Sequence, residues 1–241
     1  MGDYIAVPIT ALFCYIFLFM TMLAAQKNRI INSFLLILVA LLFWTGGSFF
    51  MRMQFWPSIK VWFDISILGL LLLGFALFNF AYQYVGCKNR AVQLFWFMTT
   101  VVINLINICT GVFLREPELV ETASGQTSFV YNTTWPVVAF FIFCTAIIAH
   151  MFVLLFRYFK DHEVARRQFH PVLVGIGFMF LGHIAFIFPF FKGIPTDIIA
   201  GVPFAFCIFY ALYRRRLFRL TLLASRGSCY ALSAGLSVIV F

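Results

Sequence analysis

The sequence of 241 residues is 63% hydrophobic and only 10% charged, and its mean hydropathy is +1.01. Soluble domains carry about 25% charged residues, so this composition excludes a soluble globular protein and predicts an integral membrane protein. The net charge of +9 and the pI of 9.5 would suggest nucleic acid as a partner of a soluble protein. In a membrane protein the distribution of basic residues follows the topology, and no nucleic-acid partner is expected here.

Seven apolar segments follow one another along the chain, and each is long enough to cross the ~30 Å hydrocarbon core of a bilayer as a helix. In chain order, the predicted spans are 4–25, 31–50, 62–85, 92–114, 135–157, 171–191 and 197–213. The chain starts with MGDYIAVP, which has no lysine or arginine and so lacks the basic start of a cleaved signal peptide. The predicted fold class is therefore all-α, a polytopic bundle of seven transmembrane helices.

The connections between the spans differ strongly in charge. If the N-terminus lies outside, thirteen of the seventeen basic residues fall on the inner side, and six of the eight acidic residues fall on the outer side. Cytoplasmic loops carry an excess of lysine and arginine, so this asymmetry predicts that the N-terminus is outside and the C-terminus is cytoplasmic. The expected location is the inner (plasma) membrane, crossed several times.

The longest connection, residues 115–134, lies on the predicted outer side and is polar and acidic at its start. It is long enough to fold over the helix ends as a lid, although a solvated linker explains its composition equally well. We keep both interpretations open.

The six cysteines lie in apolar segments or on the predicted cytoplasmic side, away from an oxidising compartment, and they show no CxxC spacing. Neither disulfides nor a metal site are expected. The cysteines are Cys14, Cys87, Cys109, Cys144, Cys207 and Cys229.

Polar side chains at membrane depth are costly and usually face the interior of a bundle, so they are the first candidates for function. Trp44, Asp64, Asn107 and His183 fall in the outer half of the predicted spans, and Asn104 falls near the middle, one helical turn from Asn107. These five residues predict a ligand-binding cleft that opens to the outside. The alternative is that they only hydrogen-bond between helices, at about 0.6 kcal/mol each.

Two histidines raise the alternative of a haem-binding redox protein, since imidazoles on adjacent helices can ligate the iron. Measured from the inner ends of their spans, His150 and His183 differ in depth by about 8 Å. Two axial ligands of one iron should be nearly level, so no cofactor is expected. A retinal protein is excluded because no lysine occurs between Asp197 and Tyr213 in the last span.

No catalytic residue is predicted, because the chain contains no GxSxG, HExxH or phosphate-binding glycine motif. The chain itself is therefore not expected to be an enzyme. The mixed-charge segment 157–171 is predicted to be a helical extension of the fifth span, and the alternative is a docking surface for a cytoplasmic partner.

Two stretches resemble the N-terminal seven-helix sensor module of bacterial histidine kinases and diguanylate cyclases. In 43–86, Trp44, Trp62 and Tyr82 take the places of a tryptophan ending helix two, a tryptophan opening helix three and an aromatic pair that ends it. The stretch 193–227 is similar to the last helix of that family, with a Gly-x-x-x-Asp start at Gly193 and Asp197 and an arginine-rich exit.

This resemblance implies a receptor that detects an extracytoplasmic or membrane-borne small molecule and signals through helix seven. The cluster Arg214, Arg215, Arg216 and Arg219 would be the signal output, which leads to a cytoplasmic kinase or cyclase domain of a longer parent. Residues 1–213 would form the sensor domain and 214–241 a basic exit helix and connector, whose last residues 228–241 could equally begin a strand or an eighth span. Membrane lipid, a cytoplasmic signalling domain and a second copy in a homodimer are the expected partners.

A small-solute transporter is the rival interpretation, with Asn104, Asn107 and His183 as its polar pathway. The absence of an internal sequence repeat argues against it, because many transporters are built from such repeats.

Overall fold

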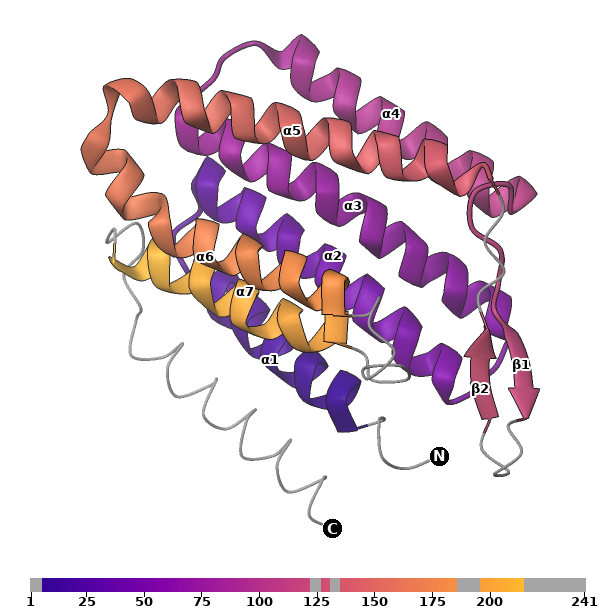
Figure 1. Cartoon of the computed structure of the whole chain (residues 1–241). Helices are drawn as coiled ribbons and strands as arrows, with labels where there is room; N and C mark the ends of the chain where they lie inside the picture. The colour runs from indigo at the N-terminus through magenta and orange to yellow at the C-terminus, as the bar shows by residue number, and fades with distance from the viewer. Residues whose placement is uncertain (1–5, 122–126, 131–134, 186–195, 215–241) are drawn as a thin grey trace.

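The computed structural model describes residues 6–121, 127–130, 135–185 and 196–214, which form a bundle of seven α-helices (Figure 1). The helices are α1 (Ala6–Leu23), α2 (Arg29–Arg52), α3 (Ile59–Val85), α4 (Arg90–Thr110), α5 (Val137–Asp161), α6 (Glu163–Ala185) and α7 (Thr196–Arg214). All seven are long and apolar enough to cross a membrane. The predicted fold, a seven-helix transmembrane bundle, is confirmed.

The connection between α4 and α5 contains a short β-hairpin. Its strands β1 (Glu118–Glu121) and β2 (Thr127–Val130) pair antiparallel, with Glu118 opposite Val130 and Glu121 opposite Thr127. The segment that sequence patterns describe only as a linker or lid thus has secondary structure of its own. It lies at the end of the bundle where α2 and α4 end (Figure 1).

Six of the seven predicted spans agree with the helices to within four residues, and the sixth does not. The helical extension of α5 over 157–171 is a wrong prediction, because α5 ends at Asp161 and His162 has non-helical dihedrals (φ −133°, ψ 73°). Residues from Glu163 onward already belong to α6, and Pro171 lies inside that helix rather than at its start.

Tertiary contacts explain why α6 begins so early. The Tyr84 hydroxyl of α3 donates a hydrogen bond to the Ala165 carbonyl at 3.0 Å, and the Phe169 ring packs edge-on against Tyr84 at a centroid distance of 4.6 Å. These contacts hold the first two turns of α6 against α3. Pro171 removes only one backbone donor, which the helix tolerates when packing supports it.

The helices alternate in direction, so the connections gather at two ends of the bundle (Figure 1). We call one of them the basic end, defined by described residues at the connections α1–α2, α3–α4 and α5–α6: Lys27, Arg29, Lys88, Arg90, Arg157, Lys160, Arg166 and Arg167. We call the opposite one the acidic end, where Asp64 and Glu116 lie and where α7 begins with Thr196 and Asp197.

The centre of the bundle is the pair α2 and α3, with α1 and α7 against α2 and with α4 and α5 against α3 (Figure 1). Two helix pairs approach closely at glycines. A side chain at Gly47 would lie 2.5 Å from the Ser66 nitrogen of α3, and one at Gly175 would lie 2.9 Å from Cβ of Cys207 in α7. Small residues let helix backbones come together in a membrane, where no hydrophobic force drives them.

α4 turns its polar side inward. Its buried residues are Thr100, Asn104 and Asn107, whereas apolar side chains such as Leu94 and Phe95 are about 60% exposed. In water this arrangement would be unstable, but lipid is the favourable surrounding for the exposed side chains. The helix therefore fits a membrane, as the composition predicts.

Candidate ligand site

Trp44 of α2 and His183 of α6 contact each other, and they are the centre of the candidate site. Their rings stack with a centroid distance of 5.7 Å and an interplanar angle of 28°. Trp44 is buried, whereas His183 is exposed two residues before the end of α6. The buried tryptophan thus lies against an imidazole at the acidic end of α6.

The His183 ring is held in one tautomer by its own helix. Its Nδ1 lies 2.8 Å from the Met179 carbonyl oxygen, and because a carbonyl can only accept, Nδ1 carries the proton and donates. Nε2 of the neutral ring then has a free lone pair, and Nε2 of the protonated ring becomes a donor.

The site is joined directly to the start of α7. The Thr196 hydroxyl donates a hydrogen bond to the Gly182 carbonyl at 2.8 Å, next to His183. A side chain at Gly182 would overlap Cβ of Ala200 and lie 2.7 Å from the Thr196 carbonyl oxygen. The residue before His183 is therefore in backbone contact with α7.

The other predicted site residues lie on the far side of α2, in the half of the bundle formed by α3, α4 and α5. Asp64 is half-buried near the acidic end, within electrostatic reach of Lys60 and Glu116. Trp44 does touch α3 through its backbone, because the Ser66 hydroxyl donates to the Trp44 carbonyl at 2.9 Å. The structure therefore places the Trp44–His183 pair in one half of the bundle and Asp64 in the other.

The Asn107 side chain hydrogen-bonds to backbone groups that follow it in the chain. Its Oδ1 accepts hydrogen bonds from the backbone nitrogens of Phe113 and Leu114 at 3.2 and 2.9 Å, and its Nδ2 donates to the Leu114 carbonyl at 3.3 Å. These bonds close the turn after α4, where Gly111 has a left-handed conformation (φ 61°). The side chain acts as a cap for the C-terminal end of α4.

Asn104 has one satisfied and one unsatisfied group. Its Nδ2 donates to the Thr100 carbonyl of the same helix at 3.2 Å, whereas its Oδ1 is buried without a hydrogen-bond partner among the described residues. The side chain is 4% exposed and lies at the interface that α4 forms with α3. Sequence patterns place it correctly inside the bundle but do not reveal this unpaired acceptor.

His150 belongs to a different contact. Its Nδ1 accepts a hydrogen bond from the Trp96 indole nitrogen at 3.0 Å, and its ring packs on Phe78 of α3. Trp44 lies at the level of Gly69 of α3, nine residues before Phe78, so the two histidines differ in level by about 13 Å. One iron with two axial imidazoles cannot bridge this offset, so the haem alternative has no support from the geometry.

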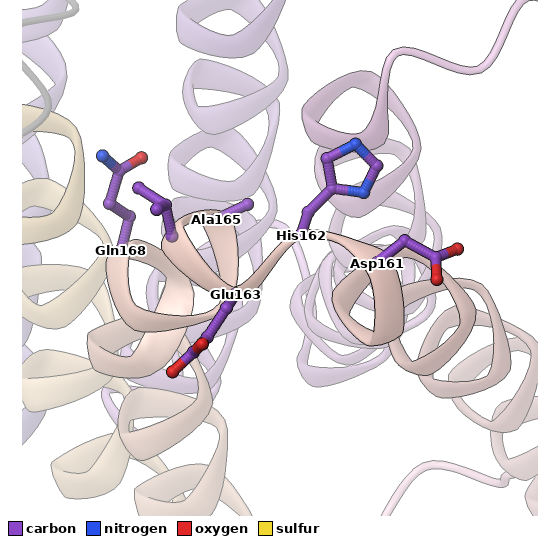
Figure 2. A pocket seen from close by; sticks show the side chains of 6 residues that line it. Asp161, His162, Glu163, Ala165 and Gln168 are labelled. Atoms are coloured by element: carbon purple, nitrogen blue, oxygen red, sulfur yellow. The ribbon is translucent and has the colours of Figure 1, made fainter.

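The basic end has a surface hollow of about 430 Å³ at the junction of α5 and α6. Figure 2 shows its lining: the His162 and Glu163 side chains point in different directions around the turn and do not converge on one point. Glu163 pairs with Arg167 at 2.8 Å and with Arg166 at 3.9 Å, all three being exposed. Such pairs contribute little energy. Of the predicted output cluster only the backbone of Arg214 is described, and Arg215, Arg216 and Arg219 lie outside the described residues.

Three residues close to the site were not singled out from the sequence: Tyr15 of α1, Thr45 of α2 and Gly201 of α7. Tyr15 and Thr45 are completely buried next to Trp44 and α7. A tyrosine or threonine within an apolar span is common, and only its position relative to other helices makes it notable. No pattern along the chain could have singled them out.

Comparison with known proteins gives a family for the whole bundle. The family model described as the N-terminal 7TM region of histidine kinase matches residues 7–221, which includes the seven helices except for the first residue of α1. No curated protein matches the chain by sequence.

Proposed function

The chain belongs to the family of N-terminal 7TM regions of histidine kinases, and from this premise we propose that it is a receptor that passes a signal through α7. The family is a sensor module without the catalytic part of the kinase, and the chain is a multi-pass membrane protein. The family match across residues 7–221 is the observation that carries the proposal. The ligand, its site and the route of the signal are our inferences.

We place the basic end in the cytoplasm and the acidic end outside, in the bacterial inner membrane. Eight basic residues gather at the connections of the basic end, and short cytoplasmic loops are enriched in such residues. The Arg214 position at the end of α7 then lies on the cytoplasmic side, where an output domain can be attached. Anionic lipid at that surface would hold the arginine cluster at about 1 kcal/mol per residue.

The ligand is proposed to bind at the acidic end, with the His183 ring as its main contact. The free Nε2 offers a lone pair or, after protonation, a donor, while Trp44 keeps the ring in place. Asp64, Asn104 and Asn107 remain candidates for a second contact region in the other half of the bundle. A ligand changes the output only if it binds one arrangement of the helices more tightly than another.

The route from this site to the output is short. The Thr196–Gly182 hydrogen bond joins the two helices at the level of His183, and α7 then runs to the basic end. A ligand that moves the His183 ring moves the first turn of α7 with it.

The test uses a histidine kinase that carries this chain as its sensor, in membrane vesicles, with autophosphorylation as the readout. A compound library is screened for a change in autophosphorylation, and each active compound is tested on His183→Ala and on His162→Ala. Loss of one good hydrogen bond weakens the response about tenfold for His183→Ala.

His162 is the matched control, because it is an exposed histidine stacked on Tyr158 at the other end of the bundle (4.3 Å, 12°). His162→Ala is expected to respond like the wild type. Equal responses of the two variants would remove His183 from the site. A fusion reporter placed after Asp161 that was active in the periplasm would contradict the proposed orientation.

A further inference from the structure

A buried contact between α1 and α7 has no role in the site described so far. Tyr15 of α1 is 0% exposed, and a Cβ added to Gly201 of α7 would overlap its hydroxyl oxygen. The next ring atom, Cζ, would lie 3.5 Å from that Cβ, which is ordinary van der Waals contact. The hydroxyl group thus fills the space that a side chain at position 201 would need.

Among the described residues this hydroxyl makes no hydrogen bond of ordinary geometry. The Thr45 hydroxyl of α2 is equally buried and close enough to interact with it. The contact with Gly201 is therefore a fit of shapes and involves no hydrogen bond to the described part of α7.

The contact lies between the ligand site and the output helix. Thr45 follows Trp44 directly in the chain, and Gly201 lies one helical turn after Asp197 of α7. Asp197 is close enough to Tyr15 to interact with it electrostatically. Three helices, α1, α2 and α7, thus meet at one point.

We propose that Tyr15 is the positioning residue of α7: its hydroxyl rests in the gap at Gly201 and sets the axial position of the helix. The proposal rests on the function proposed above, in which α7 carries the signal. A shift of α7 by one turn, about 6 Å, would exchange Gly201 for a neighbour four residues away. Only glycine, which has no side chain, leaves space for the Tyr15 hydroxyl where it now lies.

Either neighbour would bring a side chain to the hydroxyl. Movement away from the basic end would place Ala205 there, and movement toward the basic end would place Asp197 there. Both residues carry a Cβ, for which the hydroxyl leaves no space. Tyr15 therefore opposes a one-turn shift of α7 in both directions, and a signal that displaces α7 has to move the Tyr15 ring aside.

The first experiment is a double-mutant cycle on the purified chain, with the unfolding temperature in detergent or lipid nanodiscs as the readout. Gly201→Ala is expected to lower the unfolding temperature, because the new methyl overlaps the hydroxyl. Tyr15→Phe removes the hydroxyl and leaves 3.5 Å of space, so the pair Tyr15→Phe and Gly201→Ala regains most of the loss.

Tyr84→Phe is the matched control, because that buried hydroxyl does have a partner, the Ala165 carbonyl at 3.0 Å. Tyr84→Phe should lower the unfolding temperature, whereas Tyr15→Phe should leave it unchanged or raise it. A double variant no more stable than Gly201→Ala, or a Tyr15→Phe loss equal to that of Tyr84→Phe, would overturn the fit.

The second experiment measures output, using the kinase described above. Gly201→Ala is expected to change basal autophosphorylation several-fold, and adding Tyr15→Phe should return it toward the wild type.

The two proposals can fail separately. If Gly201→Ala leaves the output unchanged while His183→Ala alters it, the positioning role is wrong and the sensor function stands. If no active compound is found and neither His183→Ala nor Gly201→Ala changes autophosphorylation, both proposals are wrong. An unfolding temperature restored in the double variant would still establish that Tyr15 packs against Gly201.

Discussion

The contact between α6 and α7 and the contact between α3 and α4 bury different kinds of residue. α6 and α7 touch through backbone and small residues, so that Gly182 has no room for even one carbon atom. α4 is held through polar side chains, three of which are buried. The first contact buries small residues, and the second buries polar ones.

The polar side chains of α4 mostly hydrogen-bond to the backbone of α4 and of the turn that follows it. Thr100 donates to the Trp96 carbonyl, Asn104 donates to the Thr100 carbonyl, and Asn107 bonds to the turn that follows. Bonds from α4 to other helices are made by Gln93 to Asn79 and by Trp96 to His150. A buried polar residue in a membrane helix is thus no proof of a bond between helices, whereas a glycine without space is good evidence of close contact.

Gly182→Ala is expected to have the largest effect. The added methyl group would overlap Ala200 and the α7 backbone, which cannot move aside as a flexible side chain can. We expect a loss of about 3 kcal/mol in the free energy of unfolding, measured by reversible denaturation in mixed micelles.

Gly177→Ala is the control for this experiment on the same helix. A side chain at Gly177 would meet no atom within 4 Å. Alanine favours the helix over glycine, so this variant should be as stable as the wild type or more stable by about 0.5–1 kcal/mol. Similar losses in both variants would mean that the α6–α7 contact is not close.

Asn107→Ala should have the next largest effect, a loss of about 2 kcal/mol, because the backbone nitrogens of Phe113 and Leu114 lose their acceptor. Asn104→Ala should cost less than about 1 kcal/mol, since its Oδ1 has no partner to lose among the described residues. The same denaturation measurement compares the two. A larger loss for Asn104→Ala would show that its oxygen is bonded, for example to water.

Gln93→Leu should have the smallest effect. It breaks a hydrogen bond between helices, from Gln93 Nε2 to Asn79 Oδ1 at 2.6 Å, and such bonds contribute about 0.6 kcal/mol on average in membranes. A double-mutant cycle with Asn79→Leu isolates this coupling energy. A coupling above about 2 kcal/mol would mean that polar bonds, and not only packing, fasten α4 to α3.

Much of the fold could be predicted from the sequence, because a membrane span depends on summed hydrophobicity over about 20 residues. Six helices were placed to within four residues in this way. The start of α6 was missed because contacts of Ala165 and Phe169 with α3, far away in the chain, stabilise turns whose composition looks like a loop. For the site, depth placed Trp44 and His183 in the outer half but could not show that they touch.

The sequence by itself determined that this protein is a bundle of seven membrane helices with most of its basic residues at one end, since hydrophobicity and charge act residue by residue. Only the tertiary structure decided which side chains meet: Trp44 with His183, Asn107 with its own turn, and the Tyr15 hydroxyl with the gap at Gly201. The reason is physical. In lipid most faces of a helix are apolar, so the rotation of most helices is set by packing against their neighbours, whereas α4 shows its buried face in the spacing of Thr100, Asn104 and Asn107.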